Sequence, residues 1–423
     1  MVEIELKFQI SEARRTALLK ALDPKKSETI QLQAKYFDTP DRLLAQDGAA
    51  LRQRLEGACW IQTLKAAGKS HLHRFEHNHN LGELESSPEL DLSIYEAIPE
   101  AQQILNQALG VDAAALKLTF ETDIQRTYRV IEFEDAEIEV CLDVGVVRAS
   151  GREQTIHEVE FELKSGSVQS LLAFSFEWVK KYQLWLDVRS KAEMGNLLAL
   201  EQTVSPARFE KEFVLSKKES AAHNLSLLIG QQMQHLLPNI AAISAGVAEQ
   251  SHIDQAQTAL EHLQLTLALF KDWNSNISDK WAMQLAAFKH QFDHLQHLQH
   301  MQSTLGAFLQ NPTTTENLAK DILYAQEKLG NLVKSTQNVH HYLELLTFSL
   351  SSHDQVQKQD LKTYAHNTLQ NQYRQLQESL NAADISHFES LDVLAQKIKE
   401  LKFSFPILTS IYDVKNLQKY SKA

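Results

Sequence analysis

The chain has 423 residues, of which 43% are hydrophobic and 23% are charged, and its formal net charge is −12. This length exceeds one ordinary hydrophobic core and predicts two or three domains. The composition is that of a soluble globular protein, and the surplus of acid argues against nonspecific binding to nucleic acid.

The two cysteines, Cys59 and Cys141, are too few for a disulfide framework or a cysteine-rich metal site. We interpret them as small strand hydrophobes in a reducing compartment. The N-terminus lacks a basic stretch followed by an apolar run, and no segment approaches about 18 uninterrupted apolar residues. We therefore expect a cytoplasmic protein with neither a membrane nor a nucleic-acid partner.

The first strand expected from the sequence is Glu3-Ile4-Glu5-Leu6-Lys7-Phe8, in which charged and apolar residues alternate strictly. Alternation at period two predicts a strand with two carboxylates and one ammonium on a single face. One interpretation is an edge strand whose charged face meets water. The other is a face that points into a cavity, where Glu3 and Glu5 would bind a hard cation and Lys7 a phosphate.

Short alternating runs follow at about residues 31–38, 49–56, 59–65, 71–80, 119–133, 137–142, 144–148 and 157–163. Helices are expected at 11–22, within 83–118, at 167–182 and at 190–200. Antiparallel hairpins in this number commonly close into a barrel. After Val204-Ser205-Pro206 the strand pattern ends, and apolar residues recur at helical spacing to the end of the chain.

The predicted fold class is thus α+β, an eight-stranded antiparallel β-barrel with flanking helices followed by an all-α domain of about six to eight helices. We place the barrel domain at 1–200, a linker at 201–215 and the helical domain at 216–423. The charge is unevenly divided, with a balance of −10 over 1–216 and −2 over 217–423.

A second alternating run, His157 to Leu163, places Glu158, Glu160 and Glu162 on one strand face. Stacked carboxylates repel one another unless a cation neutralises them. Strands from both ends of a closed sheet would meet, and the expected product is a carboxylate cluster suited to Mg²⁺ or Mn²⁺.

Basic residues are spread over the same predicted strands and the last helix. They are Arg52, Arg54, Lys65, Arg74, Arg126, Arg148 and Lys191. Any one of them alone is typical of a solvated surface charge. As a set, they fit a polyanion whose oxygens are held by Arg and Lys while carboxylates hold a metal.

These residues carry a resemblance to the CYTH superfamily, the triphosphate tunnel metalloenzymes. The run Glu3 to Lys7 looks like its ExExK signature. The further blocks are Tyr36-Phe37-Asp38-Thr39-Pro40-Asp41, Leu51-Arg52-Gln53-Arg54, Thr63-Leu64-Lys65, Arg74-Phe75-Glu76, Arg126, Leu142-Asp143, Glu158 to Glu162 and Ser190-Lys191-Ala192, and they fall in the family's order. The resemblance covers roughly residues 1–200 and implies a barrel whose tunnel binds a triphosphate with a divalent metal.

From the residues and the resemblance together we expect metal-dependent hydrolysis of inorganic triphosphate, with Mg²⁺ as cofactor and Mn²⁺ as the alternative. The metal ligands would be Glu3, Glu5, Glu158 and Glu160, with Asp143 or Glu162 completing or orienting the shell. Glu5, Lys7 and Lys65 are the expected catalytic residues. The phosphates would be held by Lys7, Arg52, Arg54, Lys65, Arg74, Arg126, Arg148 and Lys191, with Glu76 and Glu139 as lesser tunnel acids.

Three alternatives stay open: an adenylate cyclase, a thiamine triphosphatase, and a non-catalytic polyphosphate-binding or scaffold protein. The helical part is similar in placement to a CHAD domain, which implies a protein partner or polyphosphate as its ligand. His290, His294, His297 and His300 share one helix face, which we interpret as solvated or facing a partner rather than as a zinc site. His71, His73, His77 and His79 are expected on a strand surface near the tunnel mouth.

Overall fold

A computed structural model describes residues 2–68, 72–110, 115–271, 277–308, 312–351 and 360–412. Contacts divide the chain into two compact units. The first contains Met1–Ala207, Leu237–His252 and Gly330–Leu343, and the second contains Arg208–Leu236, Ile253–Leu329 and Glu344–Ala423. Parts of four C-terminal helices thus belong to the first unit.

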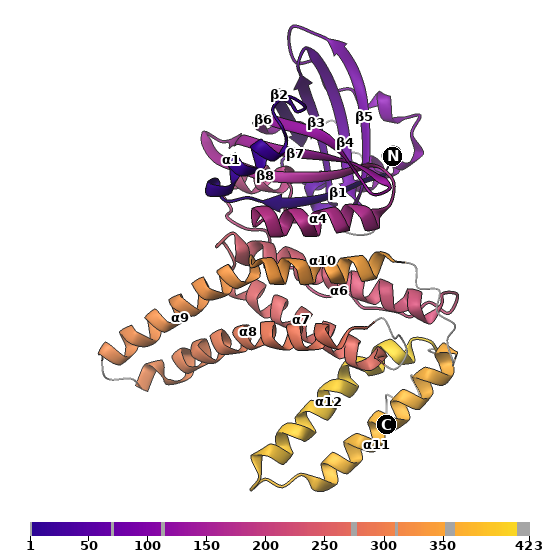
Figure 1. The fold of residues 1–423 in the computed structure, drawn as a ribbon, viewed down its shortest axis with the longest axis vertical. Coiled ribbons are helices and arrows are strands. Elements are labelled where there is room, and N and C mark those ends of the chain that lie inside the picture. Colours follow the sequence, from indigo (N-terminus) through magenta and orange to yellow (C-terminus); the bar gives the residue numbers. More distant parts are fainter. Residues whose placement is uncertain are drawn as a thin grey trace. The chain divides into compact units, whose positions relative to one another are not determined.

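The N-terminal part is a closed antiparallel barrel of eight strands (Figure 1). These are β1 (Val2–Gln9), β2 (Glu28–Asp38), β3 (Ala49–Glu56), β4 (Cys59–Ala67), β5 (His73–Glu83), β6 (Lys117–Phe133), β7 (Ala136–Ala149) and β8 (Arg152–Ser165). They are hydrogen-bonded in the order β5-β4-β3-β2-β6-β7-β8-β1, and the pairing of β1 with β5 closes the ring. A short ninth strand, β9 (Trp185–Leu186), also pairs with β1. The predicted barrel is therefore confirmed, with one strand added.

The hairpin turns explain how consecutive strands pair in this barrel. Gly57 between β3 and β4 has φ +62°, and Ser150 and Gly151 between β7 and β8 have φ 52° and 74°. Left-handed backbone in a two-residue turn matches the twist of the strands that it joins. The structure corrects one expectation, because the runs at 137–142 and 144–148 form the single strand β7.

Apolar packing decides which way the charged strand faces point. The ring centroid of Phe161 in β8 lies 5.1 Å from that of Phe8 in β1 and 5.2 Å from that of Phe174. Phe174 belongs to α4 (Val168–Tyr182), which covers the outside of these strands. Because alternate residues of a strand face opposite ways, Lys7 and Glu160 face the interior of the barrel. The interpretation of a water-facing edge strand is wrong.

Four further helices accompany the barrel: α1 (Glu12–Ala21), α2 (Leu43–Gln46), α3 (Pro99–Leu109) and α5 (Lys191–Ala199). The segment 83–118 is less helical than expected: its described helical elements are Ser93–Tyr95 and α3, and residues 84–92 are not helical. Met194 of α5 packs against the interior residues Ile124 and Val147. Helix α5 therefore contributes its side chains to the barrel interior.

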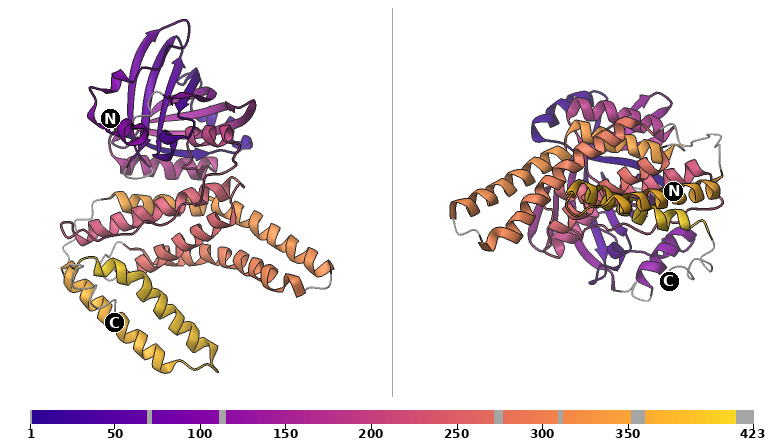
Figure 2. Two further views of the ribbon diagram at one scale, coloured as in Figure 1. Left: turned by 180° about the vertical axis from the view of Figure 1, so that it is seen from behind. Right: turned by 90° about the horizontal axis from the view of Figure 1, so that it is seen from below.

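The described C-terminal part is all-helical, as expected, with seven α-helices. They are α6 (Ala221–Ser244), α7 (Gln250–Phe270), α8 (Asp279–Leu305), α9 (Pro312–Val333), α10 (Thr336–Leu350), α11 (Leu361–Ala382) and α12 (Phe388–Thr409). Helices α11 and α12 form an antiparallel hairpin (Figure 2). Among the described residues, no helix is both long enough and apolar enough to cross a membrane.

Candidate active site

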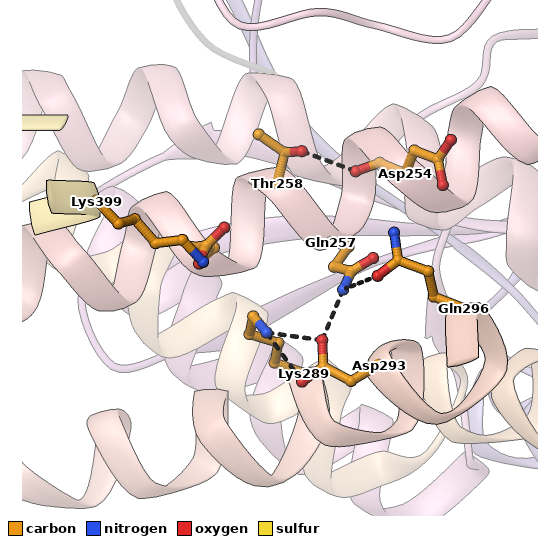
Figure 3. A pocket seen from close by; sticks show the side chains of 8 residues that line it. Asp254, Gln257, Thr258, Lys289, Asp293, Gln296 and Lys399 are labelled. Atoms are coloured by element: carbon orange, nitrogen blue, oxygen red, sulfur yellow. Dashed lines mark hydrogen bonds and ion pairs between the residues drawn. The ribbon is translucent and has the colours of Figure 1, made fainter. Parts of the chain in front are cut away.

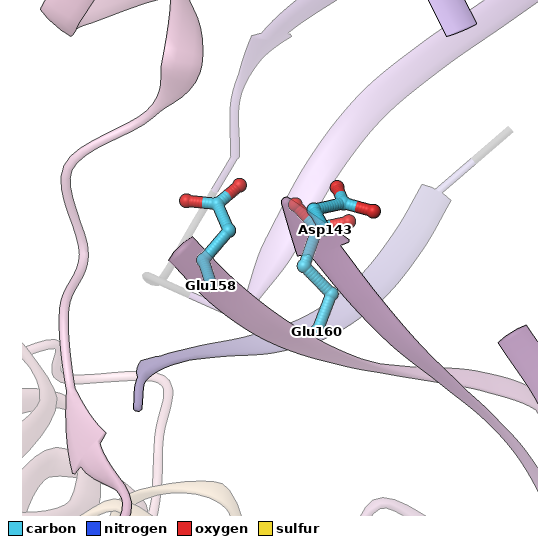
Figure 4. A group of neighbouring side chains, drawn as sticks. All are labelled: Asp143, Glu158 and Glu160. Carbon is cyan, nitrogen blue, oxygen red and sulfur yellow. The ribbon is translucent and has the colours of Figure 1, made fainter. Parts of the chain in front are cut away.

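Three carboxylates from adjacent strands meet inside the barrel (Figure 4). Asp143 of β7 pairs with Glu158 of β8, and Glu160 lies two residues further along β8. Their nearest ligand oxygens all lie within 4.8 Å of one another. Asp143 and Glu158 have no solvent exposure, and Oε2 of Glu158 has no hydrogen-bond partner among the described residues. These three residues are called the acidic trio below.

Two cations form ion pairs with the acidic trio. Arg126 of β6 donates from Nε and Nη2 to Asp143 at 2.7 and 2.6 Å and also contacts Glu160. Lys191, at the start of α5, places Nζ 2.7 Å from Asp143 and 2.8 Å from Glu160, and it pairs with Glu158 as well. Two cations thus face three carboxylates, which leaves the trio with one excess negative charge.

A second group of charges joins β1 to β4 and β5. Lys65 Nζ lies 2.8 Å from Glu3 and 2.7 Å from Glu76, and Arg74 lies 3.2 Å from Glu5. The strand register brings these side chains together, since Glu3 pairs with Arg74 and Lys65 pairs with Glu76. The closing pair of strands therefore carries a second alternating set of acids and bases.

Three further basic residues of the interior do not pair with the acids described above. Arg52 donates to the hydroxyl of Tyr36, which faces it across β2 and β3, and Arg54 pairs with Glu56. Lys7 is only 6% exposed, and no ion pair joins its ammonium to any residue in the described ranges. Lys7 and Arg52 are thus basic groups that form no ion pair with a carboxylate of the described residues.

Burial and neighbouring charges perturb the acids in opposite directions. Burial raises the pKa of Glu158 to about 7, although Lys191 and Lys7 oppose this effect. Burial acts on Glu160 and Asp143 in the same way, but nearby Lys191 and Arg126 outweigh it and lower the pKa of both. Glu158 is therefore the member of the trio that most readily holds a proton.

The second group of charges is perturbed in the same manner. Burial, which outweighs the effect of Lys65, raises the pKa of Glu3 to about 8, and the neighbouring Glu76 adds to the increase. Burial by itself would raise the pKa of Glu76 as well. The charge of Lys65, a hydrogen bond with Glu3 and the charge of Arg52 outweigh burial and lower this pKa overall. Glu3 is therefore the acid of this second group that most readily holds a proton, and Glu76 is the one that most readily ionises.

The comparisons with known proteins agree with this geometry. Residues 1–195 match the family model of the CYTH domain. This matched region is called the CYTH domain below. An inorganic triphosphatase from Haemophilus influenzae is 33% identical over 227 residues, which are 52% of this chain and 62% of that protein. The match thus spans less than two thirds of the relative's length.

Solved structures align at lower identity. A Hippeastrum protein, described as a candidate adenylyl cyclase with a dominant triphosphatase activity, is 17% identical with a TM-score of 0.35. That alignment covers 48% of this chain and 97% of the other. The CHAD domain of Ricinus communis is 11% identical with a TM-score of 0.44, covering 52% of this chain and 75% of the other.

The CYTH domain gathers most of the residues expected at the site. The interior contains Glu3, Glu5, Lys7, Arg52, Arg54, Lys65, Arg74, Arg126, Asp143, Glu158, Glu160 and Lys191. Glu162 faces the same way as Glu160 but pairs with Lys164 at 2.9 Å and lies outside the trio.

Arg148 does not join this group, and its expected role is corrected here. Its half-exposed guanidinium pairs with Asp123 and Glu153. Arg148 is five residues from Asp143 along β7, an odd separation, so the two side chains face opposite sides of the sheet. The sequence places Arg148 on a strand, but by itself it does not determine which face of that strand the side chain occupies.

Tyr36 lies in the interior beside Arg52, although the sequence did not predict a role for it in the site. Its ring stacks on Phe120 with centroids 4.4 Å apart. Burial raises the pKa of its hydroxyl, but the adjacent Arg52 outweighs burial and lowers it overall. The available signal was its position opposite Arg52 in the predicted hairpin. His71 lies outside the described residues.

The helical part contains a polar pocket of about 370 Å³ (Figure 3). It is lined by Asp254, Gln257, Thr258, Glu261, Lys289, Asp293, Gln296 and Lys399. Both lysines of the lining form ion pairs within the pocket, since Lys289 lies 2.7 Å from Asp293 and Lys399 pairs with Glu261. Because these lysines are already paired, the pocket is a poorer site for a polyanion than the barrel interior.

Proposed function

We propose that the CYTH domain hydrolyses inorganic triphosphate with the help of a divalent cation. The observation that carries this proposal is the closed barrel, whose interior holds a buried acidic trio opposite basic groups that include Lys7 and Arg52. A site for an anion alone gains nothing from three buried carboxylates, because they repel the ligand. The likeness to the Haemophilus influenzae inorganic triphosphatase supports this choice of substrate.

The acidic trio fits a divalent metal ion. Its donors are all carboxylate oxygens, which Mg²⁺ and Mn²⁺ prefer. They already lie within 4.8 Å of one another, and the unpartnered Glu158 Oε2 offers a buried acceptor. Asp143, Glu158 and Glu160 would hold one ion, and Glu3 and Glu5 would hold a second. Such ions neutralise phosphate charge and lower the pKa of bound water.

The chain's own cations would bind and orient the phosphates. Lys7 and Arg52 form no ion pair with a described carboxylate and would be the first to contact substrate oxygens. Arginine can hold two phosphate oxygens at once, and lysine acts as a point charge. Arg126 and Lys191, now paired with the trio, would turn to the phosphates when a metal replaces them.

Phosphoryl transfer of this kind relies on positioning and charge stabilisation rather than on a covalent nucleophile. Glu5, Lys7 and Lys65 remain the proposed catalytic residues. Lys65 would be released from Glu3 and Glu76 as the substrate and metal rearrange these charges. The buried interior strengthens each of these interactions relative to water.

Phosphate release by the full chain from tripolyphosphate, thiamine triphosphate and ATP, each with Mg²⁺, Mn²⁺ or EDTA, tests this proposal. We expect fast release from tripolyphosphate that EDTA abolishes. Cyclic nucleotide formed from ATP would instead identify a cyclase. No turnover of any substrate, with a melting temperature that still rises on adding tripolyphosphate, would identify a binding module.

A further inference from the structure

The α11–α12 hairpin has the apolar pattern of one half of a four-helix bundle. In α11, Leu369, Tyr373, Leu376 and Leu380 follow one helix face, and in α12, Leu391, Leu394, Ile398, Leu401 and Phe405 repeat every three or four residues. Such spacing is typical of helices that pack along a continuous seam.

Four of these nine apolar residues are largely exposed to solvent, and the other five are partly buried. The buried residues of the two helices are Ala365 in α11 and Ser404, Ile407 and Leu408 in α12, all near the end of the hairpin away from its loop. Tyr373 and Leu380 are 58% and 61% exposed, and Ile398 and Phe405 are each 50% exposed. The end of the hairpin away from its loop contacts α7, where the rings of Phe403 and His262 lie 4.9 Å apart and Lys399 pairs with Glu261. The four exposed apolar side chains nevertheless keep half or more of their surface accessible, so the described residues leave this face of the hairpin uncovered.

Charge is separated along the length of the hairpin. The half nearer the loop, residues 375–396, contains Glu378, Asp384, Glu389 and Asp392 and no Lys or Arg. The other half, residues 361–374 and 397–409, contains Lys362, Arg374, Lys397, Lys399 and Lys402 with Glu400 as its only acid. The loop half therefore carries −4 and the base half +4, of which the charge of Lys399 is paired with Glu261 of α7.

We propose that the hairpin is a dimerisation surface whose occupant is the α11–α12 hairpin of a second copy of this chain, packed antiparallel. The antiparallel arrangement places the acidic loop half of each copy against the basic base half of the other. A parallel arrangement would bring the two acidic halves together, and like charges disfavour it. A two-fold axis makes both halves of the contact identical.

The size of the hairpin is sufficient for a stable contact. Helices of 22 residues are about 33 Å long, and two side by side are about 20 Å wide. Covering this face on both copies would bury on the order of 1,300 Å², within the range of specific protein interfaces. Two such hairpins would form a four-helix bundle.

Sedimentation velocity of the full chain, over a range of protein and salt concentrations, tests the proposal. We expect a dimer that weakens with added salt, because salt screens the paired charges. Glu389→Lys with Asp392→Lys in the loop half should weaken the dimer about tenfold or more, and so should Arg374→Glu with Lys402→Glu in the base half. All four substitutions together leave both halves without net charge and should therefore also leave the dimer weakened.

Glu316→Lys with Asp321→Lys, an equal charge change on the exposed face of α9, is the matched control and should leave the dimer intact. Hydrogen exchange of residues 369–401 should be slow in the dimer and fast in the charge-reversed monomer. A wild-type chain that is monomeric at all concentrations would overturn the proposal. Slow exchange in a monomer would also overturn it, because the chain itself would then cover the hairpin.

Discussion

Glu158→Gln separates the contribution of a carboxylate to metal binding from its contribution to folding. Glu158 is fully buried beside Asp143 and Glu160, and Lys191 contacts all three. The amide keeps the shape of the side chain but removes the charge. Because Asp143 and Glu160 still neutralise Lys191 and Arg126, no buried cation loses all its partners. The substitution also removes repulsion among the three carboxylates, so the metal-free protein should be as stable as wild type or more so.

The expected loss of activity is large. Removing one charged group that stabilises a transition state in a buried site costs roughly 100- to 1,000-fold in rate, or about 3–4 kcal/mol. In the wild type, Mg²⁺ at about 100 times its dissociation constant should add about 2.7 kcal/mol of stability. For a domain of this size that corresponds to an increase of roughly 5–11 °C in melting temperature. Glu158→Gln should lose most of this increase.

Phosphate release from tripolyphosphate and differential scanning fluorimetry with Mg²⁺ or EDTA measure the two effects. Glu153→Gln is the matched control, since Glu153 lies on the same strand but is half-exposed and pairs with Arg148 outside the barrel. It should retain both activity and the response to Mg²⁺. Wild-type activity in Glu158→Gln, or an unchanged Mg²⁺-induced increase in melting temperature, would refute the assignment of the trio as a metal site.

Three further predictions concern pH, substrate binding and folding. Burial raises the pKa of Glu158 from 4.5 to about 7; the folded protein therefore holds a proton that the unfolded chain releases above pH 4.5. In EDTA the melting temperature should therefore fall as the pH rises from 4.5 to about 7, and it should fall less in Glu158→Gln. An equal decrease with pH in the two proteins would contradict this assignment. Lys7→Met should lower kcat/KM about 10- to 150-fold, while Arg148→Gln should change it less than about twofold; equal effects would show that Lys7 does not bind substrate. Asp38→Ala should destabilise the barrel by about 2–4 kcal/mol in urea unfolding, because the buried carboxylate accepts from the backbone N–H groups of Thr39, Leu44 and Ala45. The exposed Asp41→Ala is its control.

The sequence determined the strands, their turns and the chemical nature of the site. Alternation at period two is a local property, so the charged faces of β1 and β8 could be predicted without tertiary information. The turn at Ser150-Gly151 likewise follows from residues that tolerate left-handed backbone. Runs of residues at helical spacing predicted an all-helical C-terminal part for the same reason.

Only the tertiary structure decided which charges meet. Closure of β1 against β5 pairs Lys65 with Glu3 across 62 residues of sequence. The aromatic packing of Phe8 and Phe161 beneath α4 determines that the charged faces point inward. Arg148 was expected at the site because it is a charged strand residue. Its odd separation from Asp143 along β7 places it on the opposite face of the sheet. Periodicity fixes which residues share a face, but only the packing of distant elements determines whether that face meets water or other charges.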